Sequence, residues 1–267
     1  MPASYRALCS DFYVNQKLGV KLDLPRGREA MLDLFERMKR AFPGMSSLRR
    51  YKDELALESS QSEAPHRWLA IRPANLRSGV VNPTDAQEAY GLHRSVLELA
   101  PFFLSISPLD IEYLELLFGF DFAAGGNQDE LVASALLRGS PLERLFATHD
   151  AEAIDFQPVM GFFLLDGVDD EVGLPFNPEA DAEEIAASGM ELHLELKTRS
   201  GPGKSPENRG DPISVYVTLR KYEPVADVKA LPGVLDTMIE RAHAVIDERV
   251  VPNLLAPLRE TLAAGDL

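Results

Sequence analysis

The amino-acid sequence predicts an α+β fold: an antiparallel sheet with helices on one face and a long helix at the C-terminus. Two observations lead to this prediction. Segments whose apolar residues fall on alternate positions come in groups that polar turns separate, as in hairpins. Helical periodicity occurs between these groups rather than after each single strand, which argues against a doubly wound parallel sheet.

The first half of the chain is expected to begin with a half-buried strand, because apolar and polar residues alternate from Asp11 to Leu24. Apolar residues then recur at helical spacing from Met31 to Phe42. A polar stretch at residues 59–65 suits a turn between two strands. The elements expected in order are a strand at 11–24, a helix at 31–42, strands at 48–58 and 67–72, and a helix that begins near Thr84 and carries His93 on its apolar stripe.

The second half repeats the pattern of a strand, a helix, a group of strands and a helix. Asn127 and Glu130 have the spacing of a capping box at a helix start. We expect the C-terminal helix to kink or break beyond Val250, because Pro252 and Pro257 lack a backbone N–H. The elements expected are a strand at 109–122, a helix from Asn127 that Gly139-Ser140-Pro141 interrupts, strands at 154–165, 190–199 and 213–222, and a helix from Val234.

The repeated order of elements predicts two pseudo-repeated halves, residues 1–106 and 107–267, that form one continuous structural unit. The tetrapeptides Lys21-Leu22-Asp23-Leu24 and Gly119-Phe120-Asp121-Phe122, which lie 98 residues apart, favour the repeat. A second interpretation assigns residues 12–122 to a ferredoxin-like unit. The two interpretations differ in whether the strand that contains the second tetrapeptide opens the second half or closes the first.

This order of elements is similar to the saddle of TATA-binding proteins and to helix-grip folds, in which a curved sheet holds long helices on one face. The segments DFYVNQKLG at residues 11–19 and LELLFGFDF at residues 114–122 resemble uncharacterised bacterial proteins of unknown function. The first resemblance is one of topology and implies a fold alone. The second implies no activity.

Composition limits the classes of partner. The 267 residues include 27 basic and 42 acidic side chains, and the formal net charge of -15 repels polyanions, so a nucleic-acid partner is not expected. Cys9 is the one cysteine, and no apolar run approaches the roughly 20 residues that span a bilayer, so we expect a cytoplasmic protein without membrane contact. Charge is also polarised, with a balance of -11 over residues 150–184 and +5 over residues 26–52.

The best candidate for a ligand-binding or partner-binding face is a polar row on the strand expected at 190–199. Alternate residues of a strand share one face. The row consists of Glu191, His193, Glu195, Lys197 and Arg199. On the open side of a curved sheet it could bind a ligand, a metal or a partner, whereas a solvated face of self-compensating charges would explain the same pattern without chemistry.

Two shorter patterns are weaker candidates. Arg49, Arg50 and Lys52 form a basic patch, and the aromatic residue among them is typical of phosphate and single-strand binders, but the patch is short and the chain is acidic. His66 and Trp68 could form a further binding surface, although we expect the single tryptophan to pack in the core.

The sequence carries no specific catalytic, metal-binding or cofactor-binding motif, and we expect neither a metal nor a cofactor. Gly203-Lys204-Ser205 resembles the end of a phosphate-binding loop. Thr198 stands where that loop needs a glycine, however, and Pro206 follows where a helix should begin. A polar hairpin loop is therefore the favoured interpretation of this segment.

These observations favour a soluble, non-catalytic binding or assembly protein that presents an open sheet face or a charge-polarised surface to a protein partner or to another copy of itself. One alternative is a helix-grip carrier or enzyme that encloses a small molecule between the sheet and the C-terminal helix. Another is a metal-dependent hydrolase in which Glu191, His193 and Glu195 act with Asp121 or Asp155. Whether the protein is an enzyme stays open.

Overall fold

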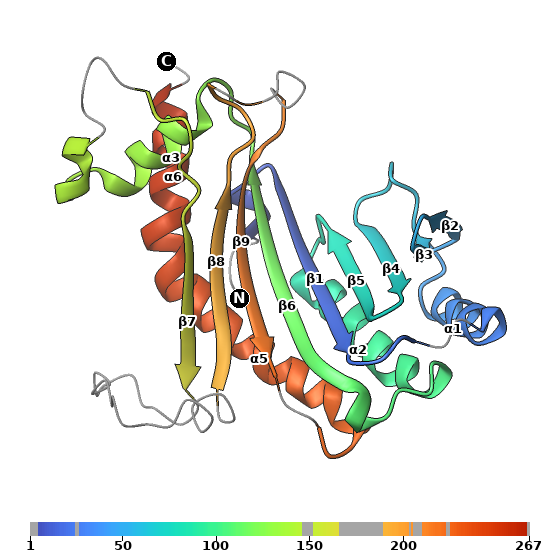
Figure 1. Cartoon of the computed structure of the whole chain (residues 1–267). Helices are drawn as coiled ribbons and strands as arrows, with labels where there is room; N and C mark the ends of the chain where they lie inside the picture. Colours follow the sequence, from blue (N-terminus) through green and yellow to red (C-terminus); the bar gives the residue numbers. More distant parts are fainter. Residues whose placement is uncertain are drawn as a thin grey trace.

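The structure, a computed structural model, describes residues 5–24, 27–145, 152–165, 189–202, 204, 210–222 and 225–265. Figure 1 shows an α+β fold in which helices pack behind an open antiparallel sheet. The strands formed by these residues are β1 (Asp11–Val20), β2 (Ser47–Tyr51), β3 (Glu54–Glu58), β4 (His66–Arg72), β5 (Asn75–Val81), β6 (Ile111–Phe122), β7 (Val159–Leu165), β8 (Gly189–Lys197) and β9 (Ile213–Lys221). The main helices are α1 (Arg28–Ala41), α2 (Ala86–Phe103), α3 (Gln128–Leu137), α5 (Leu231–Val245), the π-helical η6 (Ile246–Leu255) and α6 (Ala256–Gly265).

The strand order is β2-β3-β4-β5-β1-β6-β9-β8-β7, and β2 and β7 form the two edges. β1 and β6 are neighbours in the middle of the sheet. The other neighbour of β1 is β5, and the other neighbour of β6 is β9, so each central strand also pairs with the last strand of its own half. The two tetrapeptides are not structurally equivalent, because residues 119–122 belong to β6 whereas residues 21–24 follow the end of β1.

The hydrophobic core lies between the sheet and the helices α2 and α5. Alternation along the central strands sends Leu18 and Phe118 to the helix side, where both are fully buried. Leu97 of α2 and Met238 of α5 are fully buried as well. Complete burial of such a side chain contributes about 1.5–3 kcal/mol, so this layer fixes the helices against one face of the sheet.

Two strands differ from the expectation. The segment expected as one strand at 48–58 is a hairpin, in which β2 and β3 pair around a turn at Lys52 and Asp53. Strand β5 was not expected, because its central residues, Arg77-Ser78-Gly79, do not show the alternation of apolar and polar residues that is typical of a strand. Ser78 is nevertheless buried on the helix side, where its hydroxyl donates to Gln16 Oε1 at 3.0 Å and lies 2.8 Å from His93 Nδ1.

The helix starts follow local capping. Asn127 caps α3, since its side chain accepts from Glu130 N. The other half of the expected capping box differs, because the Glu130 carboxylate accepts from Ala153 N at 3.2 Å. The cap of α2 is Asp85 rather than Thr84, because the Asp85 carboxylate accepts from Gln87 N at 3.0 Å.

The C-terminal helix continues past Pro252 instead of breaking there. In η6 the helix widens, and Ala256 N–H donates to Val251 O, five residues earlier. The π-helical segment carries Pro252, and α6 follows it directly. Among the described residues, no helix has the length and apolar character needed to cross a bilayer.

Candidate functional site

We call the side of the sheet opposite α2 and α5 the open face. Because neighbouring residues of a strand point to opposite sides, the buried Phe12 and Val14 of β1 face the helices and Tyr13 faces the open side. The pairing register between neighbouring strands extends this assignment from β1 to the other strands of the sheet. The open face therefore consists of the odd-numbered residues of β1, β2, β5, β7 and β8 and the even-numbered residues of β3, β4 and β9. In β6 it consists of the odd-numbered residues from Tyr113 on, because the register shifts at Gly19 and Ile111 pairs with Val20 on the helix side.

Charges on the open face are balanced. With Arg199, which follows β8, the basic residues are Lys17, Arg49, Arg72, Arg77, Lys197, Arg199 and Arg220, and the acidic ones are Asp11, Glu54, Glu58, Glu115, Asp121, Glu191 and Glu195. Several are paired across strands: Arg72 and Arg77 both donate to Glu54, and Arg220 Nε donates to Glu115 at 2.9 Å. This face therefore has no strong preference for a ligand of one sign.

Aromatic rings cover glycines on the open face. A Cβ atom at Gly119 would lie 2.1 Å from the ring of Tyr13, and one at Gly19 would lie 2.5 Å from the ring of Tyr113. Tyr13 pairs with Gly119 and Tyr113 pairs with Gly19 across β1 and β6, so the two contacts are reciprocal. Trp68 covers Gly79 in the same way from β4 to β5, with 2.3 Å to a Cβ atom. Each of these three rings can occupy its position only because the residue opposite it is a glycine.

A hollow of about 600 Å³ lies on the open face over β2 to β5. Trp68 lies on its floor, with the Arg77 guanidinium 5.8 Å from the indole centroid. The residues that line it are Tyr51, Lys52, Asp53, Glu54, Glu58, Gln61, His66, Trp68, Arg72 and Arg77. Three of them are basic and three are acidic, and three carry aromatic or imidazole rings besides. Trp68 is thus half-buried at a surface and not packed in the core as expected.

The predicted row on β8 does lie on the open face, but its charges are matched internally. His193 Nε2 lies 3.1 Å from Glu191 Oε2, and Lys197 Nζ lies 3.2 Å from Glu195 Oε1. Arg199 donates across to β9, to the hydroxyl of Tyr216 at 3.3 Å and to the hydroxyl of Ser214 at 3.2 Å.

Asp121 and Asp155 do not join this row. Asp121 is level with Lys197, two strands away, because both pair with Ser214 of β9. Asp155 accepts from its neighbour Gln157 at 3.0 Å. Within the described part of the chain, no group of three or more histidine, cysteine or carboxylate side chains could hold a metal ion.

The predicted basic patch divides between the two sides of the edge hairpin. Arg49 lies on the open face, 3.8 Å from Glu58, and Lys52 lines the hollow from the turn. Arg50 occupies the other side of β2 and is exposed. Of the acidic stretch at 150–184, only residues 152–165 are described, so the predicted charge polarity falls mainly outside the described residues.

Asp121 and Cys9, which lie at the same end of β1 and β6, both have a raised pKa. Burial raises the pKa of Asp121, against the effect of hydrogen bonds from Ser214 and Tyr13. Burial and the nearby carboxylates of Asp121 and Asp11 raise the pKa of Cys9 to about 12. The Cys9 thiol is therefore protonated at neutral pH, which makes it a poor nucleophile.

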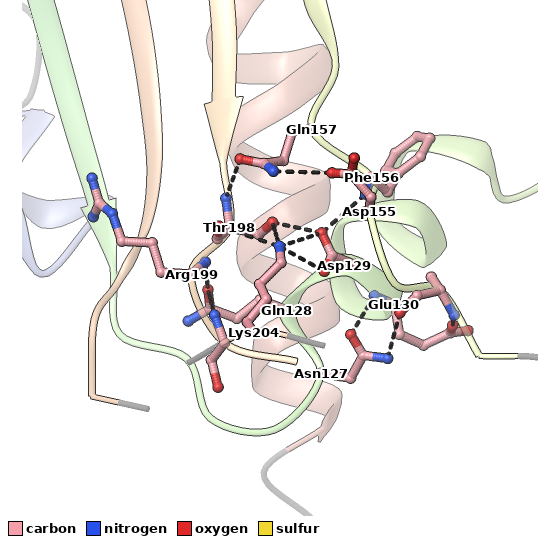
Figure 2. A network of polar contacts seen from close by, with 12 residues as sticks. Asn127, Gln128, Asp129, Glu130, Asp155, Phe156, Gln157, Thr198, Arg199 and Lys204 are labelled. Carbon is pink, nitrogen blue, oxygen red and sulfur yellow. Dashed lines mark hydrogen bonds and ion pairs between the residues drawn. The ribbon is translucent and has the colours of Figure 1, made fainter. Parts of the chain in front are cut away.

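Sequence reasoning missed a buried polar network at the start of α3, which Figure 2 shows. The Asp129 carboxylate is fully buried and lies 2.7 Å from Lys204 Nζ. It also accepts from the Thr198 hydroxyl and from Phe156 N at 3.0 Å. Burial alone would raise the pKa of Asp129, but the bonds from Lys204, Thr198 and Phe156 outweigh it and lower the pKa.

The neighbouring Gln128 completes this network. Its side chain accepts from Arg199 N at 2.7 Å and from Ser200 N, and donates to Asp211 O at 2.7 Å. The network thus attaches the chain after β8 and before β9 to the N-terminus of α3. The Lys204 amine is bound to the Asp129 carboxylate and is therefore not free to bind a phosphate.

Two histidines belong to the helix side of the sheet. His93 is fully buried, and burial lowers its pKa to about 3. His243 of α5 lies between two tyrosines, with its Nδ1 2.8 Å from the Tyr5 hydroxyl and its Nε2 2.7 Å from the Tyr90 hydroxyl. Burial lowers the pKa of His243 as well. Both imidazoles therefore act as neutral hydrogen-bonding groups on the helix side of the sheet.

Comparisons with known proteins assign no family to this arrangement. No protein-family model matches the chain, and no curated protein shows significant sequence similarity to it.

Proposed function

We propose that this protein is a non-catalytic binding protein whose open sheet face docks a segment of a partner protein. The observation that carries the proposal is the hollow over β2 to β5, which combines an aromatic floor with equal numbers of basic and acidic side chains. The few residues that contribute most to binding at protein interfaces are enriched in tryptophan, tyrosine and arginine. Balanced charge favours a peptide segment of mixed charge over a nucleic acid or another polyanion.

The side chains of the hollow are suited to recognition because they are partly held in place before binding. Arg72 and Arg77 converge on the Glu54 carboxylate, whose side chain is 14% exposed. The Tyr51 hydroxyl donates to Glu58 Oε1 at 3.0 Å, while the Tyr51 side chain remains largely exposed. Groups fixed by neighbours lose little conformational entropy when a ligand binds, which favours affinity.

Panning a displayed library of random peptides against the immobilised chain tests this proposal. We expect enriched peptides to bind wild-type protein and to lose about tenfold or more in affinity when Lys52→Ala and Arg72→Ala are combined. Lys229→Ala with Arg259→Ala is the matched control, because both residues are exposed on the helix side and the same charge is removed. Peptides that bind the two double variants equally, or no enrichment at all, would contradict the proposal.

We also propose that residues 1–106 and 107–267 are pseudo-repeats of one unit, aligned with an offset of 100 residues rather than 98. Support comes from Tyr13 and Gly19 in β1, which correspond to Tyr113 and Gly119 in β6, and from the reciprocal cover of each glycine by the tyrosine of the other strand. Similar losses of stability in Gly19→Ala and Gly119→Ala are the expected result, whereas a large loss in one and none in the other would count against the repeat.

The alternative functions have less support. A helix-grip carrier needs space between the sheet and the C-terminal helix, yet Leu235, Met238 and Ala242 are fully buried against the sheet there. A metal-dependent hydrolase needs convergent ligands, and the β8 row instead pairs its own charges.

A further inference from the structure

Strand β7 ends the sheet on the side opposite β2 (Figure 1), and none of its residues, Val159–Leu165, is charged. Phe162 and Phe163 are 48% and 47% exposed. Native proteins commonly blunt their edge strands with charges, prolines or bulges. The other edge, β2, is only five residues long and carries Arg49 and Arg50. Of the two edges, β7 is the one suited to accept a further strand.

The backbone N–H and C=O groups of alternate residues in β7 point away from β8. Leu196 N–H donates to Pro158 O at 3.0 Å, which makes these two residues a hydrogen-bonded pair. Such pairs alternate along an antiparallel ladder, so every second residue after Pro158 bonds to β8 and those between them point to the outer edge. The residues whose backbone groups point outward are Val159, Gly161, Phe163 and Leu165.

We propose that two copies of this chain associate through β7 across a two-fold axis, in an antiparallel register with Phe162 opposite itself. This is the register in which all seven residues of the strand find a partner. It brings outward-pointing backbone groups together, because Gly161 then pairs with the partner's Phe163 and Val159 pairs with the partner's Leu165. The two requirements, full overlap and matched hydrogen bonds, lead to the same register.

The same register would form a further aromatic–glycine contact of the kind found elsewhere in the sheet. On the open face an aromatic ring lies over the glycine opposite it in three places: Tyr13 over Gly119, Tyr113 over Gly19 and Trp68 over Gly79. Gly161 lies on that face too, and its nearest side chain is the His193 imidazole, 3.6 Å from where a Cβ atom would lie. In the dimer, the partner's Phe163 lies directly opposite Gly161, and each of the two glycines receives an aromatic neighbour.

An assembly of this kind closes at two copies. A two-fold interface uses the same strand from both chains, so no β7 edge remains after pairing. The charged and short β2 edges stay at the two ends of the extended sheet, where they oppose growth into a filament. Size-exclusion chromatography with light scattering should therefore give about twice the chain mass of 29.5 kDa.

A charge at the edge tests the interface. Phe163→Lys places two ammonium groups in the interface and is expected to weaken dimerisation by about tenfold or more. Leu48→Lys is the matched control, since Leu48 is a 52% exposed residue of the other edge strand and its replacement should leave the dimer intact. Circular dichroism and thermal unfolding establish that both variants are folded. A monomeric wild-type chain, or a dimer that Phe163→Lys leaves unchanged, would overturn the proposal.

Disulfide trapping tests the register in a Cys9→Ser background. A residue opposite itself at a two-fold axis has a Cβ separation of about 5 Å, within reach of disulfide formation, so Phe162→Cys should cross-link on mild oxidation. Met160→Cys should not cross-link, because it faces the partner's Leu164. Preferential cross-linking of Met160→Cys would rule out this register.

Discussion

Replacing Gly119 with alanine should destabilise the protein through one identifiable clash. The new Cβ atom would lie 2.1 Å from Cε2 and 2.3 Å from Cζ of Tyr13, whereas carbon atoms in contact are normally about 3.5–4.0 Å apart. The Tyr13 ring must therefore move by more than about an ångström. That movement breaks the bond from the Tyr13 hydroxyl to Asp121, which is 3.2 Å long. Overpacking typically costs about 1–3 kcal/mol and the lost bond about 1 kcal/mol, so we expect a loss of about 2–4 kcal/mol.

Urea unfolding of the single and double variants measures this loss and identifies its cause. Tyr13→Ala combined with Gly119→Ala should be more stable than the sum of the two single effects predicts, by about 1–2 kcal/mol, because the first change removes the ring that the second displaces. Gly91→Ala is the control: Gly91 lies within α2, and a Cβ atom there has no neighbour within 4 Å, so stability should rise by up to about 1 kcal/mol. A Gly119→Ala variant as stable as wild type, or strictly additive effects of the two substitutions, would show that Tyr13 does not require a glycine at position 119.

Three further predictions concern buried groups. The pKa of His93 is lowered to about 3, whereas the unfolded chain protonates this imidazole near pH 6.5. The contribution of His93 to the free energy of unfolding should therefore be constant above pH 6.5 and fall by about 1.4 kcal/mol per pH unit below it. Between pH 6 and 4 the pH dependence of stability should be shallower in His93→Gln than in wild type, and equal slopes would contradict this. Asp129→Asn leaves the Lys204 amine without its carboxylate and should lower the free energy of unfolding in urea by about 3 kcal/mol. Adding Lys204→Met to this variant should recover part of the lost stability. No recovery would mean that loss of the ion pair is not the cause. With its pKa at about 12, the Cys9 thiol should react with iodoacetamide at pH 8 about a thousandfold more slowly than an ordinary thiol, and alkylation at the ordinary rate would contradict the burial.

The fold could be predicted largely from sequence because alternation along strands is a local signal. The central strands β1 and β6 show it clearly, since apolar residues such as Phe12 and Phe118 are needed on one side only. Strand β5 could not be predicted, because Ser78 is polar and yet buried. Its burial depends on hydrogen bonds with Gln16 and His93, which belong to other elements.

The candidate site could be predicted less well, because its parts come from strands that only the fold brings together. Glu191 and His193 were found from the sequence since they lie two positions apart in one strand. The hollow depends on Trp68 beside Gly79 and on Arg77 near the indole, and the sequence says nothing of how β4 and β5 pair. The expectation for Trp68 was wrong because it rested on residue type alone.

The fluorescence of Trp68 can report directly whether a protein segment binds the open face at the hollow. It is the only tryptophan in the chain, so its fluorescence reports on the hollow without interference from other sites. Titration of a peptide selected by panning should shift or quench this emission in a saturable way, with the same midpoint as binding measured by calorimetry, and Lys52→Ala with Arg72→Ala should move both midpoints together. Binding measured by calorimetry without any change in Trp68 emission would place the partner elsewhere and rule out the hollow as the binding site.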